Sequence, residues 1–514
     1  MVDGNNQKTK RVATNAFVLF LRMMVLTIVN LYSVRLVLNA LGVVDYGVYN
    51  AIAALVTSGT CVTSTLAMST QRYYSFAIGK GDNQRLNQIF SASLLLTVLL
   101  ALFIILVFVI IGPWFIHNHM AIPESSVTSA VYVFYLSLAA FTLTLVQVPF
   151  LAAIFAYEEM GVYALVSTFD CLLKLLLACC LYHTSDNRLV FYGVGLVIVA
   201  IIIFLCYTLY ARRNYCVCRY RHIENIQQIK ELLSFSGWTF YGTLAGIATI
   251  QGSALTLNVF FGPIVNTAFT IGNQIYNAMN SLSGSTIVAF RPAMIKSFAR
   301  NDHEYLGKLF NIGNKMIFYL LLLIVIPFSI ETRNVLAVWL GNESVNEEMV
   351  LFVRLYMIYT VILAMNNPIT IIIQAMGKIR NYSIAVESLT LAGLPVSICL
   401  FKVGFPSYYL MLSLIAFCII AHVVRIMFLY NRYKSFSVKI YMLGFVIRAI
   451  TVTTISGIVT LYAAENMSNT TPLLHLIEVC LISTALIIAC VLAFGMTKSE
   501  KAHIVKLLSN RLKR

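Results

Sequence analysis

Long apolar segments follow one another along almost the whole chain. A helix needs about 20 such residues to cross about 30 Å of hydrocarbon. Uniform runs such as 91–111 and 317–328 lack the alternation of apolar and polar positions that transmembrane β-strands show. The pattern predicts fourteen helices, near 12–39, 44–68, 87–112, 127–156, 161–182, 190–211, 233–261, 264–290, 309–330, 348–376, 382–402, 407–430, 439–463 and 472–496. The short connections leave no room for a soluble domain, so the sequence predicts an all-α polytopic membrane protein.

The second half of the chain repeats the spacing of the first half. When the numbering is shifted by 220, Gly42 falls on Gly262. A shift of 222 places 75–77 on 297–299, where both segments read Ser-Phe-Ala. Six spans separate equivalent points, so both copies cross the membrane in the same direction, as in a parallel repeat whose axis lies along the membrane normal. The predicted architecture is therefore two parallel six-helix repeats followed by a C-terminal helix pair.

This repeat divides the chain into four parts. We expect an N-terminal six-helix half (1–211), a cytoplasmic linker (212–231), a C-terminal six-helix half (232–430), and a terminal helix pair with a basic cytoplasmic tail (431–514). Substrate paths in transporters of this kind run between the repeats. We therefore expect the two halves to rock about a central cavity by alternating access.

A glycine-containing elbow joins the first two predicted spans. It reads LNALGVVDYGVYN at residues 38–50, where Gly42 and Gly47 permit a tight turn. In the second copy, Gly262 and Pro263 take the corresponding place. We expect both elbows to lie near the outer gate of a transport path.

The charge of the chain is arranged by side. Only 11% of residues are charged, compared with about 25% in soluble domains. The net charge is +16, and 26 of the 36 Lys and Arg lie in alternate connections, beginning with the N-terminal segment. The opposite connections contain only Arg188, Arg333 and Lys402. The positive-inside rule then places both termini in the cytoplasm. The first apolar segment runs past Arg22 to Leu41, which is longer than the core of a cleaved signal peptide, so we expect it to be retained as a helix. The short connections offer no folded basic surface for a nucleic-acid partner.

Four asparagines share one face of the predicted helix at 264–290. Asn273, Asn277 and Asn280 stand at i+7, i+11 and i+14 from Asn266, which is the spacing of one helical face. Such a face can serve tight helix packing through amide groups, or it can line a water-filled cavity. We favour the cavity, because four asparagines on one face exceed what packing usually uses.

Seven basic residues fall within predicted spans: Arg22, Arg35, Lys174, Lys315, Arg354, Arg425 and Arg448. Each is costly in hydrocarbon and should face a partner, a cavity or an interface. By depth, Arg425 is interpreted as an anchor near the inner surface. Arg35 and Arg354 lie near the outer surface, where a long side chain can also reach water.

Local spacing suggests partners for two of these bases. Asp170 precedes Lys174 by four residues, so the two can form a pair within one helix. Glu478 could serve as a structural partner for Arg448, although the two residues lie at different depths. The position of Lys315, about two turns from the inner connection, leaves both a cavity role and an interface role open.

Arg22 differs from the other six bases. It lies near the predicted bilayer centre, has no acid within four residues, and shares a broad face with Asn15 and Asn30. A second helix could satisfy it structurally. We favour a ligand role, because an unpaired central cation attracts an anion. The candidate substrate site comprises Arg22, Arg35, Lys174, Lys315, Arg354, Asn15, Asn266, Asn273, Asn277 and Asn280.

Three sequence segments resemble a known family. VRLVLNALGVVDYGVYN (34–50), followed by STQRYYSFAIGKGD (69–82), is similar to the start of the polysaccharide-transporter branch of the multidrug/oligosaccharidyl-lipid/polysaccharide exporter superfamily. PITIIIQAMGKIRNY (368–382) resembles the end of that family's tenth helix. The resemblance implies a flippase in the bacterial cytoplasmic (inner) membrane. It would move a polyprenyl-pyrophosphate-linked oligosaccharide for the synthesis of lipopolysaccharide O-antigen or capsule. Its implied partners are this substrate, membrane lipids and the polysaccharide polymerase machinery.

Two other functions compete with the flippase. A cation-coupled multidrug exporter on the same fold would favour acidic residues in its cavity, but the first, seventh and eighth predicted spans contain no Asp or Glu. A membrane enzyme would need a set of catalytic residues, and none is visible in the spans. The sequence also lacks a nucleotide-binding loop, and the spacing of Cys216 and Cys218 does not suit zinc. We therefore expect no enzyme activity, no cofactor and no metal.

Overall fold

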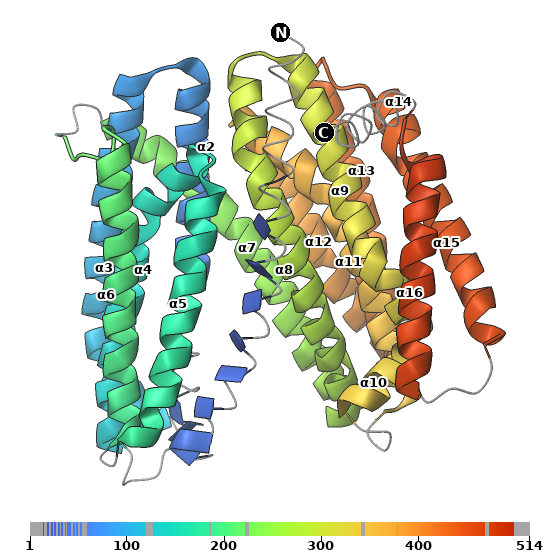
Figure 1. Ribbon diagram of the computed structural model, residues 1–514, viewed down its shortest axis with the longest axis horizontal. Helices are drawn as coiled ribbons and strands as arrows, with labels where there is room; N and C mark the ends of the chain where they lie inside the picture. Colours follow the sequence, from blue (N-terminus) through green and yellow to red (C-terminus); the bar gives the residue numbers. More distant parts are fainter. Residues whose placement is uncertain are drawn as a thin grey trace, which may run out of the picture. The chain divides into compact units, whose positions relative to one another are not determined.

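The structure is a computed structural model. It describes residues 59–119, 127–184, 187–221, 226–340, 345–377, 379–467 and 472–497, with scattered residues between 14 and 53. These parts are helical apart from turns (Figure 1). The helices are α2 (Thr60–Lys80), α3 (Asn83–His119), α4 (Val127–Ala156), α5 (Met160–Cys180), η2 (Leu181–His183), α6 (Arg188–Asn214), α7 (Ile226–Phe261), α8 (Pro263–Ala299), α9 (His303–Ile330), α10 (Thr332–Leu340), α11 (Glu347–Met376), α12 (Arg380–Lys402), α13 (Tyr409–Arg432), α14 (Val438–Tyr441), η4 (Met442–Val446), α15 (Ile447–Glu465), α16 (Pro472–Cys490) and η5 (Val491–Gly495).

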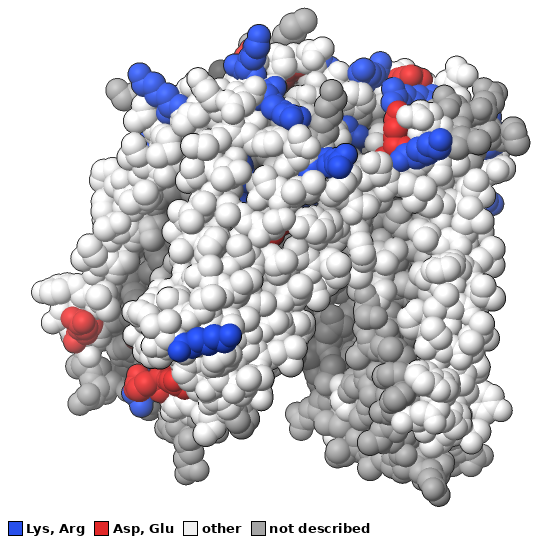
Figure 2. All heavy atoms as spheres, turned by 180° about the vertical axis from the view of Figure 1, so that it is seen from behind, with Lys and Arg blue, Asp and Glu red and all other residues white. Residues whose placement is uncertain are grey.

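Eleven helices in the described part of the chain are long and apolar enough to cross a membrane. The helix α8 is not among them although it has 37 residues, because its asparagine-bearing sequence is too polar. On the face drawn in Figure 2 the middle of the surface is mostly uncharged, and most of the visible Lys and Arg lie near the top of the view. The predicted all-α polytopic fold is confirmed.

The chain forms two compact units. The first consists of 1–243 and 288–302, and the second of 244–287 and 303–514. The helices α7 and α8 each change unit along their length. The predicted division at 211, 231 and 430 follows the sequence repeat rather than contacts, and it stays a prediction.

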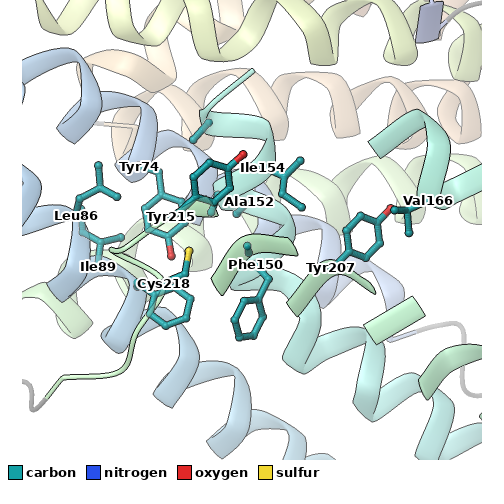
Figure 3. Close-up of a cluster of buried hydrophobic side chains, with 14 of the residues drawn as sticks. Tyr74, Leu86, Ile89, Phe150, Ala152, Ile154, Val166, Tyr207, Tyr215 and Cys218 are labelled. Atoms are coloured by element: carbon teal, nitrogen blue, oxygen red, sulfur yellow. The ribbon is translucent and has the colours of Figure 1, made fainter. Parts of the chain in front are cut away.

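The first unit is built around α4, which packs against α2, α3 and α6. Its core joins Tyr74, Phe150, Tyr207, Tyr215 and Cys218 (Figure 3). The rings of Phe90 and Phe150 meet edge to face at 5.3 Å between centroids. This core reaches the ends of α2 and α4, next to the turns that follow them.

In the second unit, α11 and α12 pack on α13, and α9 packs on α11. The terminal helices α15 and α16 contact each other and α9. The helices of the predicted C-terminal pair therefore pack on α9 within the second unit.

The backbone shows the repeat more clearly than the side chains do. Among the described residues, eight have positive φ, and all eight fall into four equivalent pairs. The pairs are Gly42 with Gly262, Gly81 with Asn301, Glu158 with Gly377, and Asn187 with Gly404. In the numbering these pairs are offset by 220, 220, 219 and 217, respectively. Since L-residues rarely adopt this conformation, the recurrence shows that the two halves share their turn geometry.

Matching helix caps at the ends of α2 and α8 correct the alignment of the two repeats that the sequence predicted there. At the end of α2, the amides of Gly81 and Asp82 donate to the carbonyls of Ile78 and Ala77, both at 3.1 Å. At the end of α8, Asn301 and Asp302 donate to Phe298 and Ser297, at 3.1 and 3.0 Å. These are two Schellman caps, and they align with a shift of 220. The shift of 222 at the Ser-Phe-Ala segments was wrong by two residues.

Candidate substrate-binding site

The guanidinium group of Arg22 is held by α5. Its Nε donates to Ser167 Oγ at 2.6 Å and its Nη2 to Tyr163 OH at 3.3 Å. The guanidinium carbon also lies 4.4 Å from the centre of the Tyr163 ring. Ser167 can accept because its own hydroxyl proton is directed to the carbonyl of Tyr163, at 2.6 Å. The first predicted span therefore has a defined partner helix.

Other described residues of that span contact α5, the short helix η2 and the start of α6. Cys171 Sγ donates to Asn30 Oδ1 at 3.5 Å, and Tyr182 OH donates to the carbonyl of Leu36 at 3.2 Å. Arg188 Nη1 donates to the carbonyl of Ala40 at 2.9 Å. Asn15, Arg35 and Gly47, three of the predicted site and elbow residues, lie outside the described residues.

One face of α5 carries the polar groups of this region. Ser167, Asp170 and Lys174 stand at i+4, i+7 and i+11 from Tyr163, which is the spacing of one helical face. Lys174 Nζ lies 2.8 Å from Asp170 Oδ2, so the predicted pair within the helix is confirmed. Lys174 is thus largely neutralised, whereas the described contacts of Arg22 are a hydroxyl, a phenol and an aromatic ring. None of these described contacts of Arg22 carries a negative charge.

The four asparagines of α8 flank its packed face. Gly272 lies so close to Tyr356 that a Cβ there would meet the ring at 2.5 Å, and the ring centre of Tyr276 lies 5.9 Å from that of Tyr356. Asn277 and Asn280 are exposed, with no side-chain hydrogen bond to a described residue. Asn266 and Asn273 are half-buried, and their amide oxygens have no described partner. Amides left unpaired in hydrocarbon are costly, so this arrangement favours contact with water or a polar ligand over packing.

Two other predicted site residues lie in the second unit. Lys315 on α9 is buried, with 7% of its surface exposed. Arg354 on α11 is exposed, and its Nε donates to the carbonyl of Ser329 at 3.0 Å. The structure thus places Arg22 against α5, Lys315 in the interior of the second unit, and Arg354 against the end of α9.

The elbow glycines adopt the conformation that a tight turn requires. Gly42 has φ +79° and Gly262 has φ +82°, and a Cβ at either would meet no atom within 4 Å. Glycine is needed at these positions for backbone conformation and not for space. The helix α8 begins at Pro263, which suits the first position of a helix because proline has no amide hydrogen.

Sequence reasoning missed a buried polar network in the second unit. Arg425 is only 6% exposed; its Nε donates to Tyr382 OH at 3.0 Å, and its Nη2 lies 3.9 Å from Glu387 Oε1. The interpretation of Arg425 as a surface anchor was wrong, because depth along α13 does not reveal an acid on α12. One turn earlier, His422 Nδ1 lies 2.7 Å from Asn366 Oδ1. The sequence signal that could have indicated this pair was an acid deep in one predicted span, Glu387, followed by a base in the next span, Arg425.

Arg448 was also assigned the wrong partner. Its Nη1 donates to the carbonyls of Phe494 and Met496, at 3.0 and 2.7 Å. These carbonyls are available because the helix ends in the π-helical segment η5.

No group of three potential metal ligands occurs among the residues described by the structure.

Comparison with solved structures defines the fold. The chain is similar to a MOP superfamily transporter from Pyrococcus furiosus, with 14% identity, a TM-score of 0.70, and 83% of this chain and 96% of that chain covered. It is also similar to VcmN, a MATE transporter of Vibrio cholerae, with 14% identity, a TM-score of 0.69, and coverage of 84% and 99%. A multidrug resistance MATE family transporter in an outward-facing conformation matches with 14% identity, a TM-score of 0.67, and coverage of 83% and 96%. The chain therefore shares the fold of these transporters.

Among curated proteins, the chain is similar to EpsK of Bacillus subtilis, an uncharacterised membrane protein. The two are 20% identical over 322 residues, which cover 62% of this chain and 63% of EpsK. The match thus spans less than two thirds of EpsK. No family model matches the chain.

Proposed function

We propose that the chain is a flippase that moves a polyprenyl-pyrophosphate-linked oligosaccharide across the bacterial inner membrane for O-antigen or capsule synthesis. The observation that carries this proposal is Arg22, a cation near the predicted bilayer centre whose described contacts are all neutral. A pyrophosphate bears about two negative charges, and removing them from water is costly without a cation. The planar guanidinium matches phosphate oxygens and keeps its charge at any working pH.

The asparagines on α8 supply the second part of the argument. Asn277 and Asn280 offer donors and acceptors to a ligand rich in hydroxyl groups. A glycan has such hydroxyl groups, and the lipid tail would remain in the bilayer. The asparagine face of α8 therefore suits hydroxyl groups, as Arg22 by itself suits an anion.

The alternative is a cation-coupled multidrug exporter, which the fold alone does not exclude. The relative in an outward-facing conformation is described as a multidrug resistance transporter. An exporter of cationic compounds needs a carboxylate that is free to bind them. Asp170 and Glu387 lie within spans, but each faces a base, at 2.8 and 3.9 Å. The Pyrococcus furiosus relative is described as having a binding pocket of reverse polarity and a different function. The charge of the site is therefore the feature that separates the two functions.

We further propose that transport proceeds by alternating access of the two six-helix halves, with the elbows at Gly42 and Gly262 near the outer gate and both termini in the cytoplasm. The matching turns of the two halves support this mechanism, because they show that the halves are built alike, and alternating access requires two such halves to move against each other. The polymerase machinery for the same polysaccharide would receive the product.

The test begins with deletion of the gene in the organism that carries it. Extracted lipids should then contain an accumulated polyprenyl-linked glycan, and the surface polysaccharide should be lost. Wild-type complementation should restore the surface glycan, and Arg22→Ala should fail to do so at equal protein level. Arg22→Lys should restore part of the surface glycan, since lysine keeps the positive charge but lacks the planar guanidinium group.

A matched control is Arg448→Ala, which removes another arginine from within a span but from the terminal pair of helices. It should restore the glycan nearly as wild type does, with protein level and melting temperature measured for every variant. Normal glycan with Arg22→Ala would rule out the proposed role of this residue. Unchanged lipids and surface glycan in the deletion strain would rule out the function.

A further inference from the structure

The end of α8 is bound closely to the end of α2. Arg300 Nε donates to the carbonyl of Gly79 at 3.1 Å. A Cβ on Gly79 would lie 2.6 Å from the Cβ of Ala299 and 2.8 Å from the carbonyl oxygen of Lys296. Real Cβ atoms do not approach so closely, so this contact requires glycine. By the shift of 220 that the caps establish, Gly79 and Ala299 are equivalent positions of the two repeats.

An ion pair ties the same end of α8 to the turn between α4 and α5. Lys296 Nζ lies 2.7 Å from Glu158 Oε1, and the two side chains are only 15% and 18% exposed. Breaking a largely buried pair by removing one partner is far more costly than breaking an exposed one. The equivalents of these residues in the other repeat are Phe76 and Gly377, so the ion pair occurs in one copy only.

Glu158 also holds an unfavourable backbone conformation. Its φ is +64°, where the equivalent residue of the other repeat is a glycine. Non-glycine residues in this region are strained and persist where the surrounding structure holds them there. The carboxylate of Glu158 therefore has a use that outweighs its strain.

A weak point in α8 lies next to this attachment. Residues 288–302 belong to the first unit, and the part of α8 before them belongs to the second. Pro292 lies within α8 and has no amide hydrogen to donate to the carbonyl of Val288. Val288 is the residue at which α8 changes unit. The helix thus lacks a backbone hydrogen bond where its two parts join different units.

We propose that Gly79, Glu158, Lys296, Ala299 and Arg300 form a clasp at the predicted cytoplasmic side, which opens and closes during transport while α8 bends at Pro292. The closed clasp holds the last turns of α8 on α2 and on the α4–α5 turn. When the clasp opens, Lys296 and Glu158 separate and each side chain is hydrated. Residues 288–302 then leave the first unit. This proposal rests on the proposed transport function, but its test requires no substrate.

The test measures how fast a buried cysteine reacts. Ser75 lies on α2 one turn before Gly79, is 0% exposed, and its hydroxyl has no described partner. Ser75→Cys therefore reports opening, in a background whose native cysteines are replaced by serine. The purified protein in lipid nanodiscs is treated with a water-soluble maleimide, and the labelling rate is followed.

Charge reversal at either partner should open the clasp. We expect Lys296→Glu and Glu158→Lys each to raise the labelling rate about tenfold, within the range measured for coupled charges in contact. The double variant, which restores opposite charges, should return the rate to near that of the parent protein. Lys308→Glu is the matched control, because Lys308 forms an equally short pair with Glu304 that is 54% and 79% exposed. It should leave the rate unchanged.

A second variant opens the clasp without any change of charge. Gly79→Leu places a side chain where Ala299 lies, and it should raise the labelling rate as well. Retained melting temperature and size-exclusion profile show that a variant is folded. Equal rates in parent, single and double variants, or no rescue by the double variant, would overturn the clasp. Such a result would leave the glycan experiments untouched, because they report transport and not the position of α8.

Discussion

The turn at Glu158 shows how a single residue can retain a costly conformation for an interaction. The strain and the ion pair can be separated by mutation, since glycine relieves the strain and alanine does not. Both remove the carboxylate.

We predict that Glu158→Gly will be more stable than Glu158→Ala by about 1 kcal/mol, because alanine keeps the left-handed strain. Thermal unfolding of the purified variants measures the difference. At Val162, within α5, the glycine variant should be the less stable of the two, because glycine is the poorer helix former. The same order at both positions would contradict the strain.

The two cysteines of the loop after α6 should differ in reactivity. Cys216 is exposed, whereas Cys218 is buried, and burial raises the pKa of the Cys218 thiol to about 12. Since the thiolate is the reactive form, Cys218 stays protonated and unreactive at pH 8.

We predict that a maleimide at pH 8 labels Cys216 and not Cys218 in the folded protein. Mass spectrometry of the digested protein identifies the labelled peptide, and variants with one of the two cysteines changed to serine serve as controls. Unfolding in detergent should make both react. Labelling of Cys218 at the rate of Cys216 would show that the loop is not packed as described.

At the scale of the element, the elbows depend on backbone conformation. We predict that Gly262→Ala lowers stability by about 1–2 kcal/mol, because φ is +82° and no neighbour would clash. Gly246→Ala within α7 is the control: it also has no atom within 4 Å, and helix propensity should make it neutral or stabilising. Thermal unfolding measures both, and equal effects would contradict the account of the elbow.

The helices and the local ion pair could be predicted from the sequence because both depend on short-range patterns. The length of an apolar segment predicts a span, and the four-residue spacing of Asp170 and Lys174 predicts their ion pair. Arg425 and Glu387 lie on different helices, α13 and α12, and no periodicity of the sequence connects them. The partners of Arg448 are backbone carbonyls, which any sequence would supply. The contact of Arg22 with Tyr163 depends on helix packing and was likewise beyond sequence reasoning.

At the scale of the whole molecule, the predicted orientation rests on the distribution of Lys and Arg. Three predicted spans, near 233–261, 264–290 and 309–330, lie between Arg221 and Val345. We predict that reporter fusions after Arg221 and after Val345 lie on opposite sides: the first should fluoresce as a cytoplasmic green fluorescent protein fusion, and the second should be active as a periplasmic phosphatase fusion. Equal signals at both points would contradict the orientation and the placement of α8 as a span.

The central claim is that the protein moves a lipid-linked glycan with Arg22 in contact with its anionic group. The most direct measurement uses proteoliposomes that contain a polyprenyl-pyrophosphate-linked oligosaccharide and follows the glycan accessible to a glycosidase added outside. Wild type and Arg448→Ala should raise the accessible fraction above that of protein-free liposomes, and Arg22→Ala should leave it at the protein-free value. An accessible fraction with wild type equal to that of protein-free liposomes, or equal transport by wild type and Arg22→Ala, would contradict the account.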